Sequence, residues 1–335
     1  MPTRNRQVRL VARPEAIPEA HHFALAEAPL EPLPEGRFRV RNAFLSVDPA
    51  MRGWVSAVAN YSRPVGIGEV MRAFAAGEIV ESRHPDWPVG MKVTGMFGWQ
   101  DFCDSDGTNV VRIVRETDLP LSWSLGVTGL TGLTGYLGLT EIGQPKPGET
   151  VVVSTAAGAV GSVVGQVAKI LGCRTVGITG GPEKVALCRE RFGYDAALDY
   201  KAETDLAAAL AAHCPQGVDV YFDNTAGAIS DAVHAQLANG ARIVVCGTAS
   251  ISSWDPWPSG PRIERHILVR RARMQGFLFF DHAAQFERAA ATLADWLRQG
   301  RLTHAEEILD GLDQAPGAIA RLYRGENRGK LLVKP

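Results

Sequence analysis

The sequence lacks the cysteine and histidine patterns that many metal-binding and redox proteins carry. Its 335 residues include only five cysteines, at positions 103, 173, 188, 214 and 246, and no two are spaced as CxxC. Neither a zinc ribbon nor a CxxC redox motif is therefore expected. No HExxH pattern occurs among the eight histidines, and we predict no metal site. An odd, scattered set of cysteines favours a reducing compartment, so we expect a cytoplasmic protein.

An excess of one charge and long apolar runs are also missing. The chain has 35 Lys and Arg against 36 Asp and Glu, a net charge of −1. Nucleic-acid binders usually carry a basic excess, so no nucleic-acid partner is expected. No run of about 18 apolar residues occurs and residues 1–9 are polar, so neither a membrane span nor a signal peptide is predicted. The length suits about two domains.

Residues 1–120 are rich in proline, glycine and short strand-like segments. The stretch RFRVR at 37–41 alternates with a period of two, as a half-buried strand does. Residues 77–82 and 90–95 are predicted as further short strands bounded by turn residues. Helical periodicity is scarce here, and a mostly β domain over residues 1–121 is predicted.

From residue 150 onward, strand and helix patterns alternate. An apolar run at 151–153 is followed by a helical pattern at 160–171. Further helices are predicted at 182–192, with Pro182 in its first turn, and at 283–298, where a helix closes the unit. Five more strands are predicted, at 174–178, 196–198, 218–222, 242–246 and 274–279. Repeated βα units indicate a parallel sheet, and six such strands predict a doubly wound α/β fold that binds a dinucleotide, over residues 122–299. The strand-like tail at 330–334 is expected to return to the first domain, so that 300–335 complete it.

The turn after the first of these strands carries the strongest chemical signal. Residues 154–161 read STAAGAVG and fit A-x-G-x-x-G, with Ala156 in place of the usual first glycine. Gly158 would let backbone N–H groups approach a pyrophosphate, and Gly161 would let the helix pack closely on the strand. Because the motif follows a strand and opens a helix, we interpret it as a dinucleotide site rather than a purely structural turn.

The end of the second strand indicates which dinucleotide binds. An NAD site has an acid about 20 residues after the glycines, on the ribose 2′-hydroxyl, but residues 178–181 read ITGG. Lys184 would instead offer a positive charge to the 2′-phosphate of NADP, unless it is only a solvated helix residue. Tyr200 is a second candidate at this end, or a surface tyrosine. We predict NADP(H).

Later strand ends and one loop supply further candidates. Ligands of such folds bind outside the carboxyl ends of the strands, and Asn224 follows one of them. Its amide would bond the ribose or the nicotinamide amide, or it is a turn residue. Trp254 and Trp257 would form an apolar lid over a substrate, or belong to a rigid surface loop.

Several motifs together resemble one family. They are SVDPAMRGW at 46–54, GLTGLTGY at 129–136, GQPKPGETVVV at 143–153, RARMQGF at 271–277 and GENRGK at 325–330. With the glycine turn, they are similar to the zinc-independent double-bond reductases of the medium-chain dehydrogenase/reductase superfamily, the group of prostaglandin and curcumin reductases. The resemblance covers nearly the whole chain.

The resemblance implies a Rossmann domain that binds NADP and a GroES-like catalytic domain. It implies NADPH-dependent reduction of the C=C bond of small hydrophobic α,β-unsaturated ketones and aldehydes. Zinc-dependent relatives use cysteines that are absent here, since Cys103 is the only cysteine of the first domain. The implied cofactor contacts are Gly158, Ala159, Val160, Gly161, Lys184, Tyr200, Asn224, Cys246, Gly247, Thr248, Ser252, Phe277, Leu278, Phe279 and Asn327.

The expected chemistry needs few protein acids. Hydride addition to the β-carbon of an enone leaves negative charge on the carbonyl oxygen, which a hydroxyl donor would stabilise before the α-carbon is protonated. Tyr61 aligns with a substrate-site tyrosine of bacterial members and is the candidate donor, or a packing residue. Met51 and Arg52 are predicted in the substrate pocket, although Arg52 also suits a structural role. Ala50 stands where some members have tyrosine.

Two other functions stay open at this point, and so does the assembly. The fold would also serve an NADPH:quinone oxidoreductase or a non-catalytic protein that binds NADPH. The sixth predicted strand is apolar and lies at the sheet edge, so a homodimer is expected.

Overall fold

The computed structural model describes residues 3–57, 61–251 and 256–335. The chain forms two compact units, one made of Met1–Gly126 with Glu306–Pro335 and the other of Val127–Ala305. Among the described residues, none of the helices combines the length and the apolar character that crossing a membrane requires.

The unit Val127–Ala305 is built on a six-stranded sheet in which all neighbours are parallel. Its order is β10–β9–β8–β11–β12–β13. From β8 the strands are added toward one edge as far as β10, and from β11 they are added toward the other edge, so the strand order reverses between β8 and β11. The prediction of a doubly wound α/β fold is therefore confirmed, and the reversal is where such folds bind ligands. The strands are β8 (Thr150–Ser154), β9 (Arg174–Thr179), β10 (Ala196–Asp199), β11 (Val218–Asp223), β12 (Leu237–Val245) and β13 (Arg273–Gly276).

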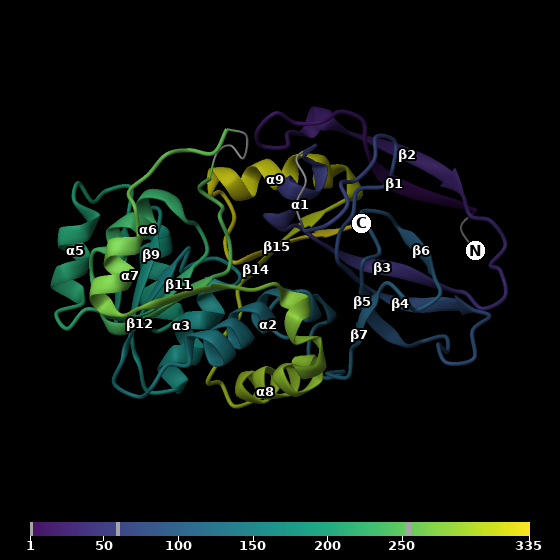
Figure 1. The fold of residues 1–335 in the computed structure, drawn as a ribbon. Helices are drawn as coiled ribbons and strands as arrows, with labels where there is room; N and C mark the ends of the chain where they lie inside the picture. Colours follow the sequence, from purple (N-terminus) through teal and green to yellow (C-terminus); the bar gives the residue numbers. More distant parts are fainter. Residues whose placement is uncertain (1–2, 58–60, 252–255) are drawn as a thin grey trace. The chain divides into compact units, whose positions relative to one another are not determined.

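Helices cover both faces of this sheet (Figure 1). One face packs against α5 (Leu206–His213), α6 (Gly227–His234) and α7 (Glu264–Arg270) through side chains such as Val152, Tyr221 and Ile243. On the opposite face, Val220 and Val244 approach Gly143 at the end of the π-helical turn Gly138–Gly143, which follows α2 (Leu130–Leu137). All five residues of β8 are buried, as expected of a central parallel strand.

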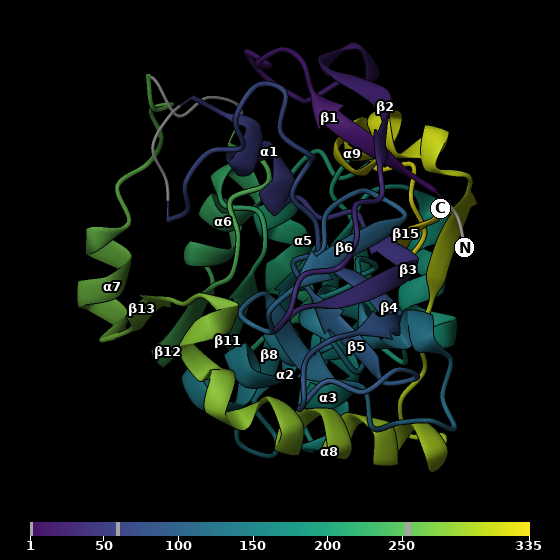
Figure 2. The ribbon, with the colours of Figure 1, turned by 90° about the vertical axis from the view of Figure 1, so that its right-hand side faces the viewer.

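The predicted helices and strands of this unit need two corrections. The helix predicted at 182–192 is α4 (Pro182–Ala186) followed by a π-helical turn over Leu187–Arg191. The sixth strand was predicted as apolar over 274–279, which is wrong in extent and character. β13 ends at Gly276 and its four residues RMQG are all exposed. Among the described strands it pairs with β12 alone, at the sheet edge (Figure 2). The chain leaves the sheet at Phe277 because the aromatic side chains that follow pack on helices of the same unit.

The remaining helices of this unit are α3 (Gly161–Ile170) and α8 (Phe286–Arg298), which is preceded by a 3-10 segment over Phe279–Gln285. Both helices lie close to their predicted ranges. Phe279 stacks on Phe286 at a centroid distance of 4.1 Å, which attaches the start of the 3-10 segment to α8.

The other unit is mostly β. Its larger sheet has the order β14–β15–β3–β4–β5–β7, with β6 also pairing with β3. The strands are β3 (Phe38–Ser46), β4 (Ala75–Ser82), β5 (Lys92–Gly95), β6 (Phe102–Ser105), β7 (Val110–Ile113), β14 (Glu306–Asp310) and β15 (Lys330–Lys334). The C-terminal β15 runs antiparallel to β3, with Leu332 opposite Ser46. β14, which the sequence did not predict, pairs in parallel with β15.

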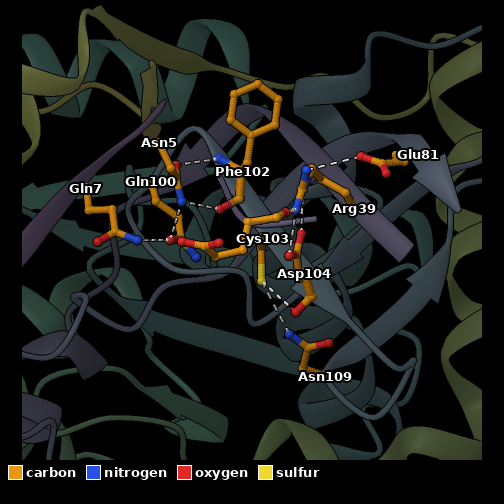
Figure 3. A network of polar contacts seen from close by, with 10 residues as sticks. Asn5, Gln7, Arg39, Glu81, Gln100, Phe102, Cys103, Asp104 and Asn109 are labelled. Atoms are coloured by element: carbon orange, nitrogen blue, oxygen red, sulfur yellow. Dashed lines mark hydrogen bonds and ion pairs between the residues drawn. The ribbon is translucent and has the colours of Figure 1, made fainter. Parts of the chain in front are cut away.

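A two-stranded ribbon and two helices complete this unit. The ribbon consists of β1 (Arg4–Leu10) and β2 (Phe23–Pro29), and the helices are α1 (Ala50–Val55) and α9 (Ala315–Arg324). A polar network holds β1 against β6 and the residues before it (Figure 3). Asn5 donates to the Phe102 carbonyl and accepts from its N–H, both at 2.9 Å. These polar contacts fix the register of β1, while Val8 and Leu10 of the same strand are buried in the core.

Candidate functional site

The glycine turn between β8 and α3 is shaped by close backbone contacts. A Cβ at Gly161 would overlap the carbonyl oxygen of Thr155, and one at Gly158 would lie 2.9 Å from the Thr155 methyl group. The first helical hydrogen bond runs from the Ser162 N–H to the Gly158 carbonyl (2.9 Å). The N–H groups of Ala159, Val160 and Gly161 therefore lie ahead of the helical ladder, where helix N-termini bind anions.

Tyr194 stabilises this turn through a hydrogen bond to its backbone, a role that the sequence did not predict. Its hydroxyl donates to the Gly161 carbonyl at 2.6 Å, and its buried ring occupies the space that side chains at Gly165 and Gly177 would need. Burial raises the pKa of Tyr194 well above its usual value, so the hydroxyl keeps its proton. Glycines at 165 and 177 were the signal that a large side chain lies between helix and strand.

The end of β9 gathers aromatic and basic side chains around Gly180. Atoms of Tyr200 and Lys201 lie 3.0 Å from the position that a Cβ at Gly180 would take. Lys184 lies nearby in sequence on α4, which packs on β9 and β10. Asp199, the last residue of β10, accepts from the backbone N–H groups of Gly181 (2.8 Å) and Lys201 (3.0 Å). Its carboxylate thus organises the turn. Lys201 was not predicted.

The carboxyl ends of β8, β11 and β12 meet around Asn224. Its backbone N–H donates to the Ser154 hydroxyl (2.8 Å) and its side-chain amide donates to the Ser154 carbonyl (2.7 Å). The N–H groups of Cys246 and Gly247 donate to the Asp223 carbonyl at 2.8 and 3.1 Å. Three predicted positions are thus brought together, and Thr248 follows directly, bonded through its carbonyl to the Ile251 N–H.

The cysteines of the chain are held as neutral thiols. Burial raises the pKa of Cys246 and Cys188 to about 12, and that of Cys103, Cys173 and Cys214 to about 11. A group of three or more His, Cys, Asp or Glu that could hold a metal ion does not occur within the described part of the chain.

The three consecutive residues 277–279, predicted to contact the cofactor, each pack in a different environment. Phe277 lies against the α2 end, where a Cβ at Gly138 would come within 2.5 Å of its ring. The Leu278 N–H donates to the Asp281 carboxylate at 2.7 Å, and the Leu278 side chain is exposed. Phe279 is the residue stacked on α8. Trp257 is 70% exposed, whereas Ser252 and Trp254 lie outside the described residues.

In the mostly β unit, α1 carries two predicted residues. Met51 is fully buried and Arg52 nearly so. The Arg52 guanidinium lies 5.5 Å from the ring centre of Tyr323, whose hydroxyl donates to the Pro49 carbonyl at 3.0 Å. Tyr323 on α9 therefore fixes the start of α1 and the orientation of Arg52.

A buried ion pair holds the residues before α1. The Lys330 ammonium donates to the Asp48 carboxylate (2.8 Å), the Ser46 hydroxyl (2.7 Å) and the Val47 carbonyl (2.9 Å). Lys330 is only 1% exposed. Asn327, three residues earlier, donates to the Gly329 carbonyl at 2.9 Å, which shapes the turn into β15.

Tyr61 lies in the same unit, with 61% of its surface exposed. Loss of water around its hydroxyl raises the pKa of Tyr61, with Asp48 acting in the same direction and Trp54 and Arg72 opposing it. The phenol therefore keeps its proton at neutral pH and can donate a hydrogen bond.

Comparisons with known proteins agree with these features. Residues 6–113 match the family described as the N-terminal domain of oxidoreductase, and residues 159–295 match the one described as zinc-binding dehydrogenase. The NADPH-dependent curcumin reductase of Escherichia coli is 41% identical over 99% of this chain and 97% of its own length. Prostaglandin reductase 1 of Mus musculus is 39% identical over 96% of both chains.

A solved structure extends the likeness to three dimensions. CurA from Vibrio vulnificus in complex with NADPH has a TM-score of 0.92 and 40% identity, covering 98% of both chains. The Escherichia coli quinone oxidoreductase, at 18% identity and a TM-score of 0.80, shares the fold alone. With its motifs matched over nearly the full length, the chain belongs to the zinc-independent double-bond reductases of the medium-chain dehydrogenase/reductase superfamily.

Proposed function

We propose that this protein uses NADPH to reduce the C=C bond of small hydrophobic α,β-unsaturated ketones and aldehydes. The observation that carries the proposal is the match over nearly the whole chain to reductases named for curcumin, 2-alkenals and prostaglandins. It is an NADP-dependent oxidoreductase that acts on carbon–carbon double bonds, in a fold whose strand ends provide a dinucleotide site.

The residues present fit NADPH. At the glycine turn, Gly158 and Gly161 allow the close approach of the backbone to Thr155. The N–H groups of Ala159, Val160 and Gly161 precede the first helical hydrogen bond, where a pyrophosphate would bind. At the end of β9, the Asp199 carboxylate bonds the backbone, and Tyr200 and Lys201 lie together against Gly180. We assign the 2′-phosphate to Lys184, Tyr200 and Lys201, because a cation and hydroxyl or ammonium donors suit phosphate.

The remaining cofactor contacts are proposed from the strand ends. Asn224 is assigned to the ribose or carboxamide, and Cys246, Gly247 and Thr248 supply backbone groups beside it. Phe277, Leu278, Phe279 and Asn327 are assigned to the cofactor on the family resemblance. When bound, NADPH supplies a hydride for the β-carbon of the substrate.

Tyr61 is the proposed catalytic donor. Hydride addition places negative charge on the carbonyl oxygen, and a protonated phenol stabilises that charge by hydrogen bonding. The raised pKa of Tyr61 keeps the proton available for this task at neutral pH. Met51, Arg52 and Trp257 are proposed to line the substrate pocket. Protonation at the α-carbon completes the reaction.

We also propose a cytoplasmic homodimer that associates through the edge of the parallel sheet. The edge strand β13 exposes its backbone, and apolar side chains around it are exposed too, with Leu268 at 74% and Phe280 at 53%. Edge strands of this kind pair across two-fold axes. Light scattering after size exclusion should give about twice 36.1 kDa, and a monomer would contradict the proposal.

The decisive test is oxidation of NADPH, with NADH in parallel, over linear and aryl enones, quinones and saturated ketones. The proposal expects a product that gains two hydrogens at the C=C bond, with NADPH preferred. One-electron products from quinones alone would make the protein a quinone oxidoreductase. NADPH binding without turnover of any enone would make it a non-catalytic binding protein.

A further inference from the structure

One buried carboxylate lies at the point where three strand ends converge. Asp223 is the last residue of β11 and is only 2% exposed. Within the described residues, no Lys or Arg forms an ion pair with it. A carboxylate buried in this way needs several hydrogen-bond donors to replace water.

Those donors come mainly from the turn that follows β11. Oδ1 of Asp223 accepts from the backbone N–H groups of Thr225 and Ala226, both at 2.9 Å. Its other oxygen accepts from the Ser230 hydroxyl at 2.6 Å, and the Tyr221 hydroxyl donates to Oδ1 at 3.1 Å. The side chain thus fixes both ends of the short segment 225–230.

The turn that Asp223 holds is strained. Ala226 has φ +58° and ψ −163°, a region that glycine adopts readily and that other residues avoid. On the other side, the Ser250 hydroxyl lies 2.8 Å from the Thr225 carbonyl and 2.9 Å from that of Ala226, and donates to them. Asp223 therefore accepts hydrogen bonds from the N–H groups of residues 225 and 226, and Ser250 donates hydrogen bonds to their carbonyl groups.

Asn224 directly precedes the two residues that Asp223 and Ser250 hold. Its backbone N–H donates to the Ser154 hydroxyl, and one side-chain N–H donates to the Ser154 carbonyl. Its Oδ1 accepts no hydrogen bond from the described residues, which leaves an acceptor for a hydroxyl group of a ligand. The orientation of that oxygen depends on the turn keeping its strained form.

We propose that Asp223 is a positioning residue for the cofactor, acting with Ser250 to hold the strained turn 224–226 so that Asn224 is preset for NADPH. This inference rests on the proposed function only in taking NADPH as the ligand. Asp223 acts through the turn and does not itself contact the cofactor. Its carboxylate is needed because one oxygen must accept from two adjacent N–H groups while the other accepts from a hydroxyl.

The test measures the NADPH Kd of the full-length protein by calorimetric titration, without any enone. Asp223→Asn should raise the Kd about tenfold, because an amide nitrogen cannot accept where the carboxylate did. Asp219→Asn is the matched control. Asp219 lies on the same strand toward its other end and accepts from the Thr150 N–H at 2.9 Å, and this variant should bind NADPH within twofold of wild type.

Relief of the strain separates positioning from general damage. Ala226→Gly alone should leave the Kd within twofold, since the wild-type turn already holds this conformation. In the Asp223→Asn background, Ala226→Gly should recover at least threefold in affinity, because glycine accepts the conformation without help. Absence of any recovery would overturn the positioning role, as would an Asp223→Asn variant that binds like Asp219→Asn.

A milder variant keeps the proposal testable if Asp223→Asn does not fold. Ser250→Ala removes the hydroxyl hydrogen bonds to the two carbonyls but keeps the one from the backbone N–H of residue 250 to the Thr225 carbonyl (2.9 Å). It should raise the Kd about threefold, again with recovery by Ala226→Gly. An unchanged Kd there would contradict the proposal. Wild-type protein that binds NADPH but reduces no enone would refute the proposed function alone, whereas normal turnover with an unchanged Kd in Asp223→Asn would refute this inference alone.

Discussion

The two units of this protein stabilise a buried carboxylate in different ways. In Val127–Ala305, Asp223 is satisfied by hydroxyl and backbone donors, several of them within seven residues along the chain. In the mostly β unit, Asp48 pairs with Lys330, which lies 282 residues away in sequence. The first arrangement belongs to one strand end and the loops around it. The second forms only when the C-terminal strand β15 has joined the sheet, so the conformation of the residues before α1 depends on residues far away in sequence.

Breaking the distant pair should produce the largest effect. Lys330→Met leaves the Asp48 carboxylate buried without its cation, and such a loss costs about 3–5 kcal/mol. Chemical denaturation should show this drop in the free energy of unfolding. Lys334→Met, at the exposed end of the same strand, is the control and should change stability by less than about 0.5 kcal/mol. If the two variants were equally stable, the pair would not hold this part of the unit.

Removing the proposed donor tests the chemical role of the same unit. Tyr61→Phe should lower kcat about 100-fold, because the negative charge on the carbonyl oxygen loses its hydrogen bond. The NADPH Kd should stay unchanged, since Tyr61 is not assigned to the cofactor. A kcat within twofold of wild type would exclude Tyr61 as the donor.

The pH profile gives an independent check on Tyr61. The active form is the protonated phenol, and its pKa is raised above the ordinary tyrosine value of 10.0. Activity due to this group should therefore persist through pH 10.0 and fall only above it. A decline centred below that value in wild type, and absent in Tyr61→Phe, would show a lowered pKa instead.

A smaller effect is expected at the glycine turn. Gly161→Ala forces a methyl group against the Thr155 carbonyl, and overpacking of this kind costs about 1–3 kcal/mol. Calorimetry should show weaker NADPH binding together with a lower unfolding temperature. Gly317→Ala in α9, where a Cβ meets nothing within 4 Å, should instead leave NADPH binding unchanged and stabilise the protein slightly.

Two single substitutions with a tenfold effect sharpen the cofactor assignment. Lys201→Ala and Lys184→Ala should each weaken NADPH binding about tenfold and leave NADH binding unchanged, because only NADPH carries the 2′-phosphate. Equal losses for both dinucleotides would place these lysines away from that phosphate. A loss in Lys184→Ala alone would remove Lys201 from the site.

The parallel sheet was predictable because its central strands carry their own signal. Buried parallel strands are rich in apolar residues, and β8, β9 and β11 contain the short apolar runs VVV, VGI and VYF. β14 was missed because three of the five residues in its sequence, EEILD, are charged, and because it forms a strand by pairing with β15. The strand predicted at 274–279 was too long because residues 277–279 have strand propensity. In the structure, the packing of Phe277 and Phe279 against helical segments overrides that propensity.

The candidate site shows the same division. Gly158, Gly161 and Asn224 follow strands at fixed offsets, so the sequence places them. Tyr194 and Lys201 gave no such pattern, because each is placed by a glycine that lies next to it only in the folded chain. The positioning role proposed for Asp223 could not be predicted from the sequence either. An acid at a strand end can serve many purposes, and only its hydrogen bonds to the following turn indicate this role.

The raised thiol pKa values have a consequence for an enzyme of this proposed class. Unsaturated carbonyl compounds are soft electrophiles, and they alkylate proteins mainly through the thiolate form of cysteine. With pKa values of about 11 to 12, all five cysteines remain almost entirely protonated near pH 7. Little thiolate is therefore present for such compounds to attack, and Cys173, Cys188 and Cys214 are also buried.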